Sequence, residues 1–105
     1  MEKYKYPMID AIKTGEWIRY LCKRKNITVA EIQEKLHITS NQAIYAWFCG
    51  KTLPSLNNLY ALGELLGIPM EQMIVDDVHE HPLLRNITAY EKRMVVYSYR
   101  MMQMR

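Results

Sequence analysis

Residues 28–50 read TVAEIQEKLHITSNQAIYAWFCG and contain two short helical patterns on either side of a turn. The first opens with a capping box from Thr28 to Glu31, in which each end satisfies a free backbone N–H of the other. Its apolar residues recur at helical spacing as far as Leu36, and the second pattern stops at Gly50. The N-cap candidates of the second helix are Thr39 and Ser40. The stretch therefore predicts two short helices that meet at a tight turn.

Helical signals continue on both sides of this stretch. Thr14 is the predicted N-cap of a preceding helix that runs to about Lys25. Ser55 caps a following helix that ends at Gly67, and Pro69 opens a short further one. The sequence shows no convincing strand alternation, so the predicted fold class is all-α. The residues expected in the core are Trp17, Ile18, Leu21, Ile32, Leu36, Ala43, Ile44, Trp47, Leu56, Leu59, Leu62 and Leu66.

The chain divides into four predicted segments. An N-terminal arm spans residues 1–13, the helical domain 14–75, a linker 76–87 and a C-terminal helix 88–105. The last helix begins with a second capping box and carries an a/d stripe of apolar residues. Such a stripe must pack either on the domain or on another copy of the chain. It consists of Tyr90, Met94, Tyr97, Met101 and Met104.

Composition gives little support to catalysis or to a bound metal. The two cysteines, Cys22 and Cys49, form no CxxC unit, so a zinc site is not expected. His79 and His81 lie in an acidic linker, where we expect solvated side chains. No Ser/His/Asp order, glycine-rich phosphate loop or apolar carboxylate pair indicates an enzyme, and no cofactor is expected. The formal net charge of +3 permits a polyanionic partner without requiring one.

Targeting signals are not recognisable in the sequence. The charged first residues and the lack of an apolar stretch after them argue against a signal peptide. No apolar run approaches the roughly 20 residues that a membrane span needs. We therefore expect a cytoplasmic, nucleoid-associated bacterial protein whose cysteines are free thiols.

Two short helices joined by a turn within a helical bundle make a helix-turn-helix, whose second helix fits the DNA major groove. Beyond this plan, the chain from Ile18 to Ile74 resembles the phage-repressor (Cro-like, XRE) family. The resemblance implies a five-helix lambda-repressor-like bundle, to which the C-terminal helix is an addition, and a role in DNA binding and transcription regulation. The stretches that carry it are, in order, Ile27–Glu31, Gln42–Trp47, Gly50–Ser55, Leu59–Gly67 and Met73–Ile74.

The chain departs from this family in two places. The turn between the two helices looks one residue longer than in the phage repressors. The family often buries an Arg of its first helix against a Glu that ends the recognition helix, and these positions hold Cys22 and Phe48 here. Loss of one partner would leave a buried charge unpaired, which costs about 3–5 kcal/mol of folding stability, whereas replacement of both partners by apolar residues can be neutral. We predict that Cys22 and Phe48 lie in or near contact.

The resemblance places base-reading side chains in the first turn of the recognition helix, which starts near Asn41. Gln42 is the leading candidate, because its amide can donate and accept in one plane toward N6 and N7 of adenine. Asn41 can do the same or contact a phosphate. Tyr45, one turn further, can contact a thymine methyl group, and Ala46 is predicted to allow close approach to the bases.

Contacts with the DNA backbone are predicted at neighbouring helix ends. Thr28 begins a helix whose free N–H groups and dipole favour a phosphate. Lys51 follows the glycine that ends the recognition helix, and Ser40 lies at the start of that helix. Asn57 and Asn58, early in the next helix, are candidates of the same kind. Because the recognition helix itself is uncharged, we expect modest non-specific binding.

The leading interpretation is a sequence-specific transcriptional regulator, a repressor, that binds a double-stranded operator as a homodimer. The C-terminal helix is expected to contribute to the dimer. The alternative is an antitoxin or other protein-binding module with the same fold. In that case the C-terminal stripe or the tyrosine-rich arm would hold a different protein.

Overall fold

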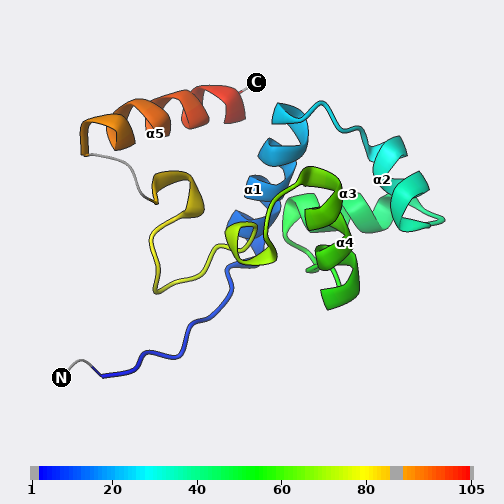
Figure 1. The fold of residues 1–105 in the computed structure, drawn as a ribbon, viewed down its shortest axis with the longest axis horizontal. Coiled ribbons are helices and arrows are strands. Elements are labelled where there is room, and N and C mark those ends of the chain that lie inside the picture. The colour runs from blue at the N-terminus through cyan, green and yellow to red at the C-terminus, as the bar shows by residue number, and fades with distance from the viewer. Residues whose placement is uncertain (1–2, 86–88, 105) are drawn as a thin grey trace.

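Helices account for most of the described backbone. The computed structural model describes residues 3–85 and 89–104 of the chain. Within those ranges the chain forms five α-helices, two short 3₁₀ helices and no strand beyond one isolated bridge (Figure 1). The elements are α1 (Ala11–Arg24), α2 (Val29–Leu36), α3 (Asn41–Cys49), α4 (Leu56–Leu66), η1 (Met70–Gln72), η2 (Pro82–Leu84) and α5 (Ala89–Gln103). The all-α prediction is confirmed.

Most helix ends form where the sequence predicted them. The hydroxyl of Thr28 accepts the N–H of Glu31 at 3.1 Å, and the Glu31 carboxylate accepts the N–H of Thr28 at 3.3 Å, so the capping box is confirmed. Ser40 rather than Thr39 caps α3, its hydroxyl accepting the N–H of Gln42 at 3.2 Å. The cap of α4 and the left-handed ends of α3 and α4 are also as predicted, at Ser55, Gly50 and Gly67.

The start of α1 differs from the prediction. Its N-cap is Asp10, whose Oδ1 accepts the N–H of Lys13 at 2.9 Å, so the assignment of this role to Thr14 is wrong. Thr14 lies inside the helix and is 1% exposed. Its hydroxyl donates to the carbonyl of Val75 at 3.2 Å and accepts the Val75 N–H at 3.0 Å. Asp and Thr are both favoured at N-caps. Here the hydroxyl of Thr14 is bonded to Val75, 61 residues further along the chain, and Asp10 takes the N-cap position instead.

A single core lies between the first four helices. Its fully buried apolar side chains are Ile18, Ile32, Ile44, Leu62 and Met73. Two residues predicted in the core are exposed instead, namely Ala43 and Leu56, the latter at 74%. Leu56 is the first residue of α4, and the buried stripe of that helix begins only with Leu59. Helical spacing predicts the stripe but not the turn at which its burial begins.

The fifth element of the bundle is reduced to the 3₁₀ helix η1. Pro69 precedes it, as predicted, and Met73 follows it with 0% exposure. At the two positions where the resemblance implies a buried ion pair, Cys22 is 3% exposed, and Phe48 is half-buried against the same core. Burial raises the pKa of the Cys22 thiol to about 11, so that it stays neutral. Direct contact between Cys22 and Phe48 stays a prediction.

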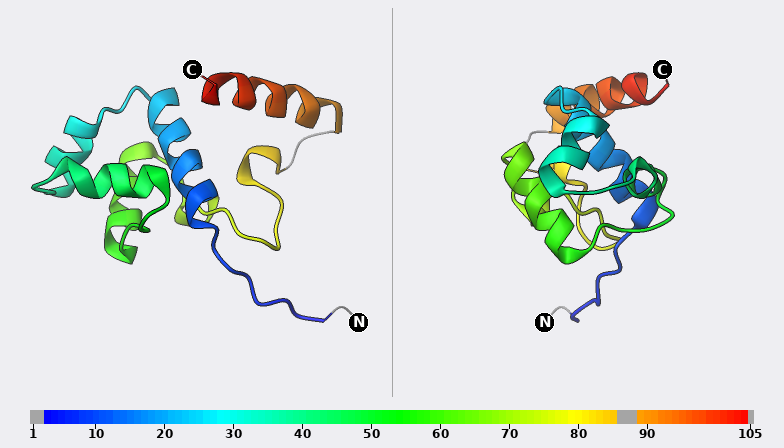
Figure 2. Two further views of the ribbon diagram at one scale, coloured as in Figure 1. Left: turned by 180° about the vertical axis from the view of Figure 1, so that it is seen from behind. Right: turned by 90° about the vertical axis from the view of Figure 1, so that its right-hand side faces the viewer.

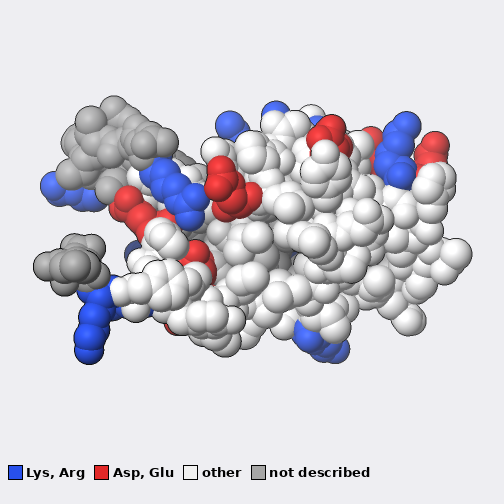
Figure 3. Space-filling view, turned by 60° about the horizontal axis from the view of Figure 1, so that its bottom comes forward, with Lys and Arg blue, Asp and Glu red and all other residues white. Residues whose placement is uncertain are grey.

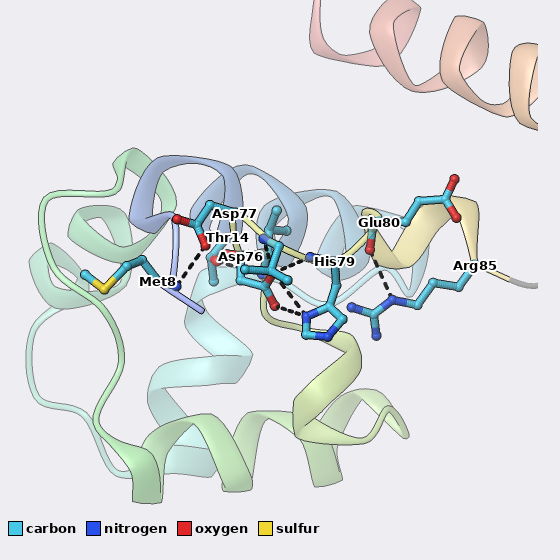
Figure 4. A network of polar contacts seen from close by, with 9 residues as sticks. Met8, Thr14, Asp76, Asp77, His79, Glu80 and Arg85 are labelled. Atoms are coloured by element: carbon cyan, nitrogen blue, oxygen red, sulfur yellow. Dashed lines mark hydrogen bonds and ion pairs between the residues drawn. The ribbon is translucent and has the colours of Figure 1, made fainter. Parts of the chain in front are cut away.

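Two segments far apart in sequence are tied together beside the start of α1 (Figure 4). The N–H of Asp10 donates to the carbonyl of Val75 at 2.8 Å, and the N–H of Asp77 donates to that of Met8 at 3.1 Å. The N–H of Met8 donates to Oδ1 of Asp77 at 2.9 Å. Together with the hydroxyl of Thr14, these bonds fasten the arm to the segment that follows η1. We call this contact the clasp, formed by residues 8–10, 14 and 75–77.

The last residues of the clasp lead into a turn at residues 76–79, which the carboxylate of Asp76 holds. Its Oδ1 accepts the backbone N–H groups of His79 at 2.7 Å and Val78 at 2.8 Å. These two bonds, followed by the contact with the His79 ring, lower the pKa of Asp76 to about 2. A little further along, Nε of Arg85 donates to the carbonyl of Glu80 at 3.1 Å (Figure 4). This part of the predicted linker therefore has a defined path.

α5 lies on the opposite side of α1 from α2, α3 and α4 (Figures 1 and 2). It is held there by an aromatic cluster, in which Tyr99 of α5 approaches Tyr20 of α1 with ring centroids 4.9 Å apart. Trp17 lies 5.4 Å from Tyr20 and 4.8 Å from the ring of His81 by the same measure. We call this group, Trp17, Tyr20, His81 and Tyr99, the aromatic cluster.

The prediction that His81 is a solvated linker residue is wrong, whereas His79 is exposed as expected. His81 is half-buried beside Trp17, and its Nδ1 accepts the N–H of Leu83 at 3.0 Å. Burial, and then the charges of Lys13 and Arg85, lower its pKa. Acidic neighbours in the sequence suggested solvation, but the tryptophan that covers this ring lies 64 positions away.

The predicted stripe on α5 faces solvent. Met94 is 56% exposed, Tyr97 66%, Met101 48% and Met104 80%. The side chain that docks the helix is Tyr99, outside the stripe, and burial raises its pKa to about 12. The side chain of Tyr90 and the predicted capping box at 88–91 lie outside the described residues. The four described residues of the stripe are thus exposed.

Candidate nucleic-acid interface

The first turn of α3 is directed to solvent while its other face anchors the helix. Ile44 is 0% and Trp47 5% exposed. Asn41 and Gln42 are exposed, and Tyr45 is 50% exposed. Residues three and four apart share one side of a helix, so Tyr45 lies beside both. The structure therefore brings these three predicted base readers onto one exposed surface.

The start of α3 is fixed by the connection that precedes it. Residues 37–40 separate α2 from α3. His37 takes a left-handed backbone with φ of 55°, and its N–H donates to the carbonyl of Gln33. Ser40 then caps α3 by accepting the N–H of Gln42. The hydroxyl hydrogen of this exposed serine can still be donated to a phosphate.

The second turn of α3 contains the other two predicted base contacts. The ring of Tyr45 packs edge-on against Phe48, with centroids 6.1 Å apart and planes at 84°. Ala46 is half-buried, and its carbonyl accepts the N–H of Lys51 at 3.0 Å where α3 ends. Tyr45 is therefore held along the helix, and the methyl group of Ala46 is only partly accessible.

Thr28 is exposed at the N-terminus of α2, but that end already holds a carboxylate. Oε1 of Glu31 accepts both the N–H and the hydroxyl of Thr28, each at 3.3 Å. A phosphate would have to approach this negative charge or displace it. The backbone N–H groups of Val29 and Ala30, next in the chain, are the better donors at this helix end.

The remaining backbone candidates follow α3 in sequence. Lys51 is exposed directly after Gly50, and its N–H is used to close α3. Asn57 is exposed in the first turn of α4, whereas Asn58 is half-buried and donates its N–H to the hydroxyl of Ser55 at 3.1 Å. Lys51 and Asn57 thus flank one connection between α3 and α4.

Three exposed residues on or next to α3 were not predicted to be part of this surface. Ala43, predicted to be buried, is exposed beside Gln42, and Thr39 is exposed just before the cap. Cys49 is exposed one turn after Tyr45, with its thiol 2.8 Å from the carbonyl of Tyr45. A small apolar residue on a short helix gives no signal of which side it faces, so Ala43 could be found only from the packing of its neighbours.

Charge on this part of the surface comes from the flanking elements. α3 has no charged residue. Figure 3 shows one face of the molecule, with the part formed by α2, α3 and α4 on the right, as in Figure 1. That part is mostly uncharged, with acidic and basic groups along its rim. The lysines closest in sequence to α3 are Lys35 at the end of α2 and Lys51. A polyanion bound at α3 would meet its cations at the edges of the contact.

Residues 3–85 and 89–104 contain no cluster of three or more His, Cys, Asp or Glu side chains suited to a metal ion. In the same ranges no helix combines the length and the apolar character needed to cross a membrane.

Comparison with known proteins identifies the family. A family model described as helix-turn-helix matches residues 18–73, just over half of the 105 residues. No curated protein and no solved structure matches the chain. The matched residues include α2, the 37–40 connection and α3, with the packing described above. The chain therefore belongs to the Cro/C1-type (XRE) helix-turn-helix family of DNA-binding transcriptional regulators.

Proposed function

We propose that this regulator is a repressor that reads a specific operator with the first two turns of α3. The observation that carries the proposal is the division of α3 into two faces. Ile44 and Trp47 fix the helix in the core, and Asn41, Gln42 and Tyr45 are exposed on the other side. A recognition helix needs this combination, because base contacts require rigid placement of exposed polar groups.

Each side chain on this surface has a proposed partner on the duplex. Gln42 pairs with N6 and N7 of an adenine, and Asn41 contacts a neighbouring base or phosphate. Tyr45 packs on a thymine methyl group, and Ala46 lets the helix lie close to the bases. The proposed contacts to the DNA backbone come from Thr28, Ser40, Lys51, Asn57 and Asn58.

We propose that two copies bind together and that α5 contributes to the contact. The stripe of Met94, Tyr97, Met101 and Met104 is exposed in a single copy, and an apolar helix face of this kind favours association. A dimer would place two copies of α3 about one helical turn of DNA apart. Light scattering is expected to give twice the mass of one chain, and a monomer at high concentration would contradict this proposal.

Binding selection from random duplexes tests the assignment of Gln42. The wild type should enrich a site with two-fold symmetry. The centres of its half-sites should lie about 10 base pairs apart, as in operators bound by helix-turn-helix dimers. Gln42→Ala should lose preference at one position of each half-site, by about 1–3 kcal/mol, while keeping salt-sensitive binding. Gln72→Ala is the matched control, because Gln72 is exposed on η1 rather than α3.

The outcomes of this selection separate the alternatives. An unchanged preference in Gln42→Ala would contradict the role of that residue. A wild type that enriches no sequence, but co-purifies with an unrelated small protein, would favour an antitoxin or other protein-binding module. The repressor role is tested separately, by whether the selected site placed within a promoter reduces its transcription.

A further inference from the structure

We propose that the aromatic cluster releases α5 in acid, when the ring of His81 takes up a second proton. The ring of Tyr99 brings α5 into the cluster, and His81 lies beside it. The chain contains three histidines, and His81 is the half-buried one, since His37 and His79 are exposed. The inference concerns the docking of α5 and does not rest on the proposed function.

The ring of His81 lies where three elements meet. Its centroid is 4.8 Å from that of Trp17 in α1, with the planes at 81°, and 5.8 Å from that of Tyr99 in α5. His81 is also the N-cap of η2, and η2 packs against α5. A change of charge or position at this ring therefore acts on α1, η2 and α5 together.

One hydrogen bond decides which ring nitrogen of His81 carries the proton. Nδ1 accepts the N–H of Leu83 at 3.0 Å, so the neutral ring has its proton on Nε2. The charged ring carries a proton on both nitrogens and accepts nothing. A second proton would therefore point an N–H of the ring at the N–H of Leu83. Protonation thus removes the side-chain cap of η2 and forces the ring to leave its docked position.

The basic residues near His81 also oppose a second proton. Burial of the ring is the largest cause that lowers its pKa, followed by the positive charges of Lys13 in α1 and Arg85 after η2. Nε of Arg85 donates to the carbonyl of Glu80, which fixes this cation to the same segment of chain. A charged His81 would thus be a further cation in a half-buried position.

Other groups near the cluster favour the charged ring. The acidic residues are Glu80, directly before His81, and Glu16 of α1, whose charge acts on Tyr99. The two phenols of the cluster are those of Tyr20 and Tyr99. Burial, followed by the charge of Glu16, raises the pKa of Tyr99 to about 12, so its hydroxyl stays neutral in acid. The faces of aromatic rings also attract cations. The pKa of His81 is lowered nonetheless, because burial and the two cations outweigh these attractions.

The docking of α5 should therefore weaken as the pH falls. A released histidine has a pKa of about 6.5, and the docked His81 has a lower one. Above about pH 6.5 the ring is neutral in both states, so docking has its full strength. Below that pH the released state binds the extra proton, and each further unit weakens docking up to about tenfold. The loss ends once the pH passes below the docked pKa.

NMR of the full chain with labelled histidine and tyrosine rings follows both events between about pH 8 and about pH 5. The ring of His81 should titrate below about 6.5, and the ring of Tyr99 should lose the shifts that the cluster induces over the same range. The clasp is an internal reference, because Asp76 has a pKa of about 2 and keeps its charge there. In Tyr99→Ala, which lacks the docking side chain, the pKa of His81 should rise toward that of a free histidine, because the coupling is reciprocal.

Two histidine variants complete the test. His81→Asn keeps a side-chain acceptor for the N–H of Leu83, since asparagine is favoured at N-caps, but it cannot titrate. Its Tyr99 ring should show no change between about pH 8 and about pH 5. His79→Asn is the matched control, because it removes an exposed histidine two positions away. It should respond to pH as the wild type does.

The inference is overturned by a His81 pKa at or above about 6.5 in the wild type, or by the same pKa in the wild type and Tyr99→Ala. This comparison holds even where asparagine at position 81 docks α5 weakly. A Tyr99 ring that keeps its environment while His81 becomes charged would also contradict it, as would an acid response that persists in His81→Asn. None of these measurements involves DNA, so each outcome leaves the proposed function as it stands.

Discussion

Gly15→Ala should destabilise the domain by about 3 kcal/mol, although alanine is the better helix former. Gly15 lies in the middle of α1 and is buried where that helix crosses α3. A Cβ atom at this position would collide with the carbonyl oxygen of Trp47 and lie 2.9 Å from that of Phe48. Both atoms belong to the backbone of α3, so relief requires the recognition helix to move. The clash therefore outweighs the 0.5–1 kcal/mol or so that alanine gains in a free helix.

Urea unfolding followed by circular dichroism measures this change. Arg19→Ala, at an exposed position of the same helix, is the control and should change stability by no more than about 0.5 kcal/mol. A shift of α3 should also weaken binding to the selected duplex beyond what partial unfolding explains. A Gly15→Ala protein as stable as the wild type would show that α1 and α3 are further apart than described.

Trp17→Ala should cost about 3–5 kcal/mol, the range for truncating a large buried aromatic side chain. Trp17 is 6% exposed, and its Nε1 donates to the carbonyl of Gln72 at 2.7 Å. Its side chain belongs to the buried core of the bundle. It is also a member of the aromatic cluster, in which the rings of Tyr20 and His81 lie within 5.4 Å of its own between centroids. The substitution therefore affects both the bundle and the docking of α5.

Tyr99→Ala separates these two contributions. Tyr99 is the member of the aromatic cluster that α5 contributes, and it is only partly buried against the bundle core, so its loss should free α5 at a smaller cost, about 1–1.5 kcal/mol. Limited proteolysis should then cut before α5 while residues 11–75 stay protected. Equal losses of stability in the two variants would contradict a core that is complete without α5.

The sequence allowed accurate prediction of most helix ends, where the signal is local. The capping box at Thr28, the serine caps of α3 and α4 and the left-handed glycines at 50 and 67 all depend on contacts within a few residues. Predictions that depended on distant partners were wrong. The role of Thr14 is decided by Val75 and the burial of His81 by Trp17, and neither pairing leaves a trace in nearby sequence.

The candidate site shows the same division. Exposure of Asn41, Gln42 and Tyr45 follows from the period of α3, because the apolar positions that anchor it are evident in the sequence. The capping box already predicts that the Glu31 carboxylate lies next to Thr28. The hydrogen bonds of that carboxylate to the N–H and hydroxyl of Thr28 show that it would compete with a phosphate for this residue. Which base each side chain meets is a property of the complex and stays a prediction.

The most direct test of base reading by α3 removes the proposed contact from each side in turn, the amide of Gln42 on the protein and the N7 acceptor on the base. In the selected duplex, 7-deazaadenine replaces the adenine at the position whose preference Gln42→Ala loses, which deletes only the N7 acceptor in the major groove. Affinities of wild type and Gln42→Ala for both duplexes form a double-mutant cycle. If Gln42 contacts N7, the modified base should weaken the wild type at least several-fold and leave Gln42→Ala unaffected. Equal weakening of both proteins, or of neither, would contradict reading of that base by Gln42.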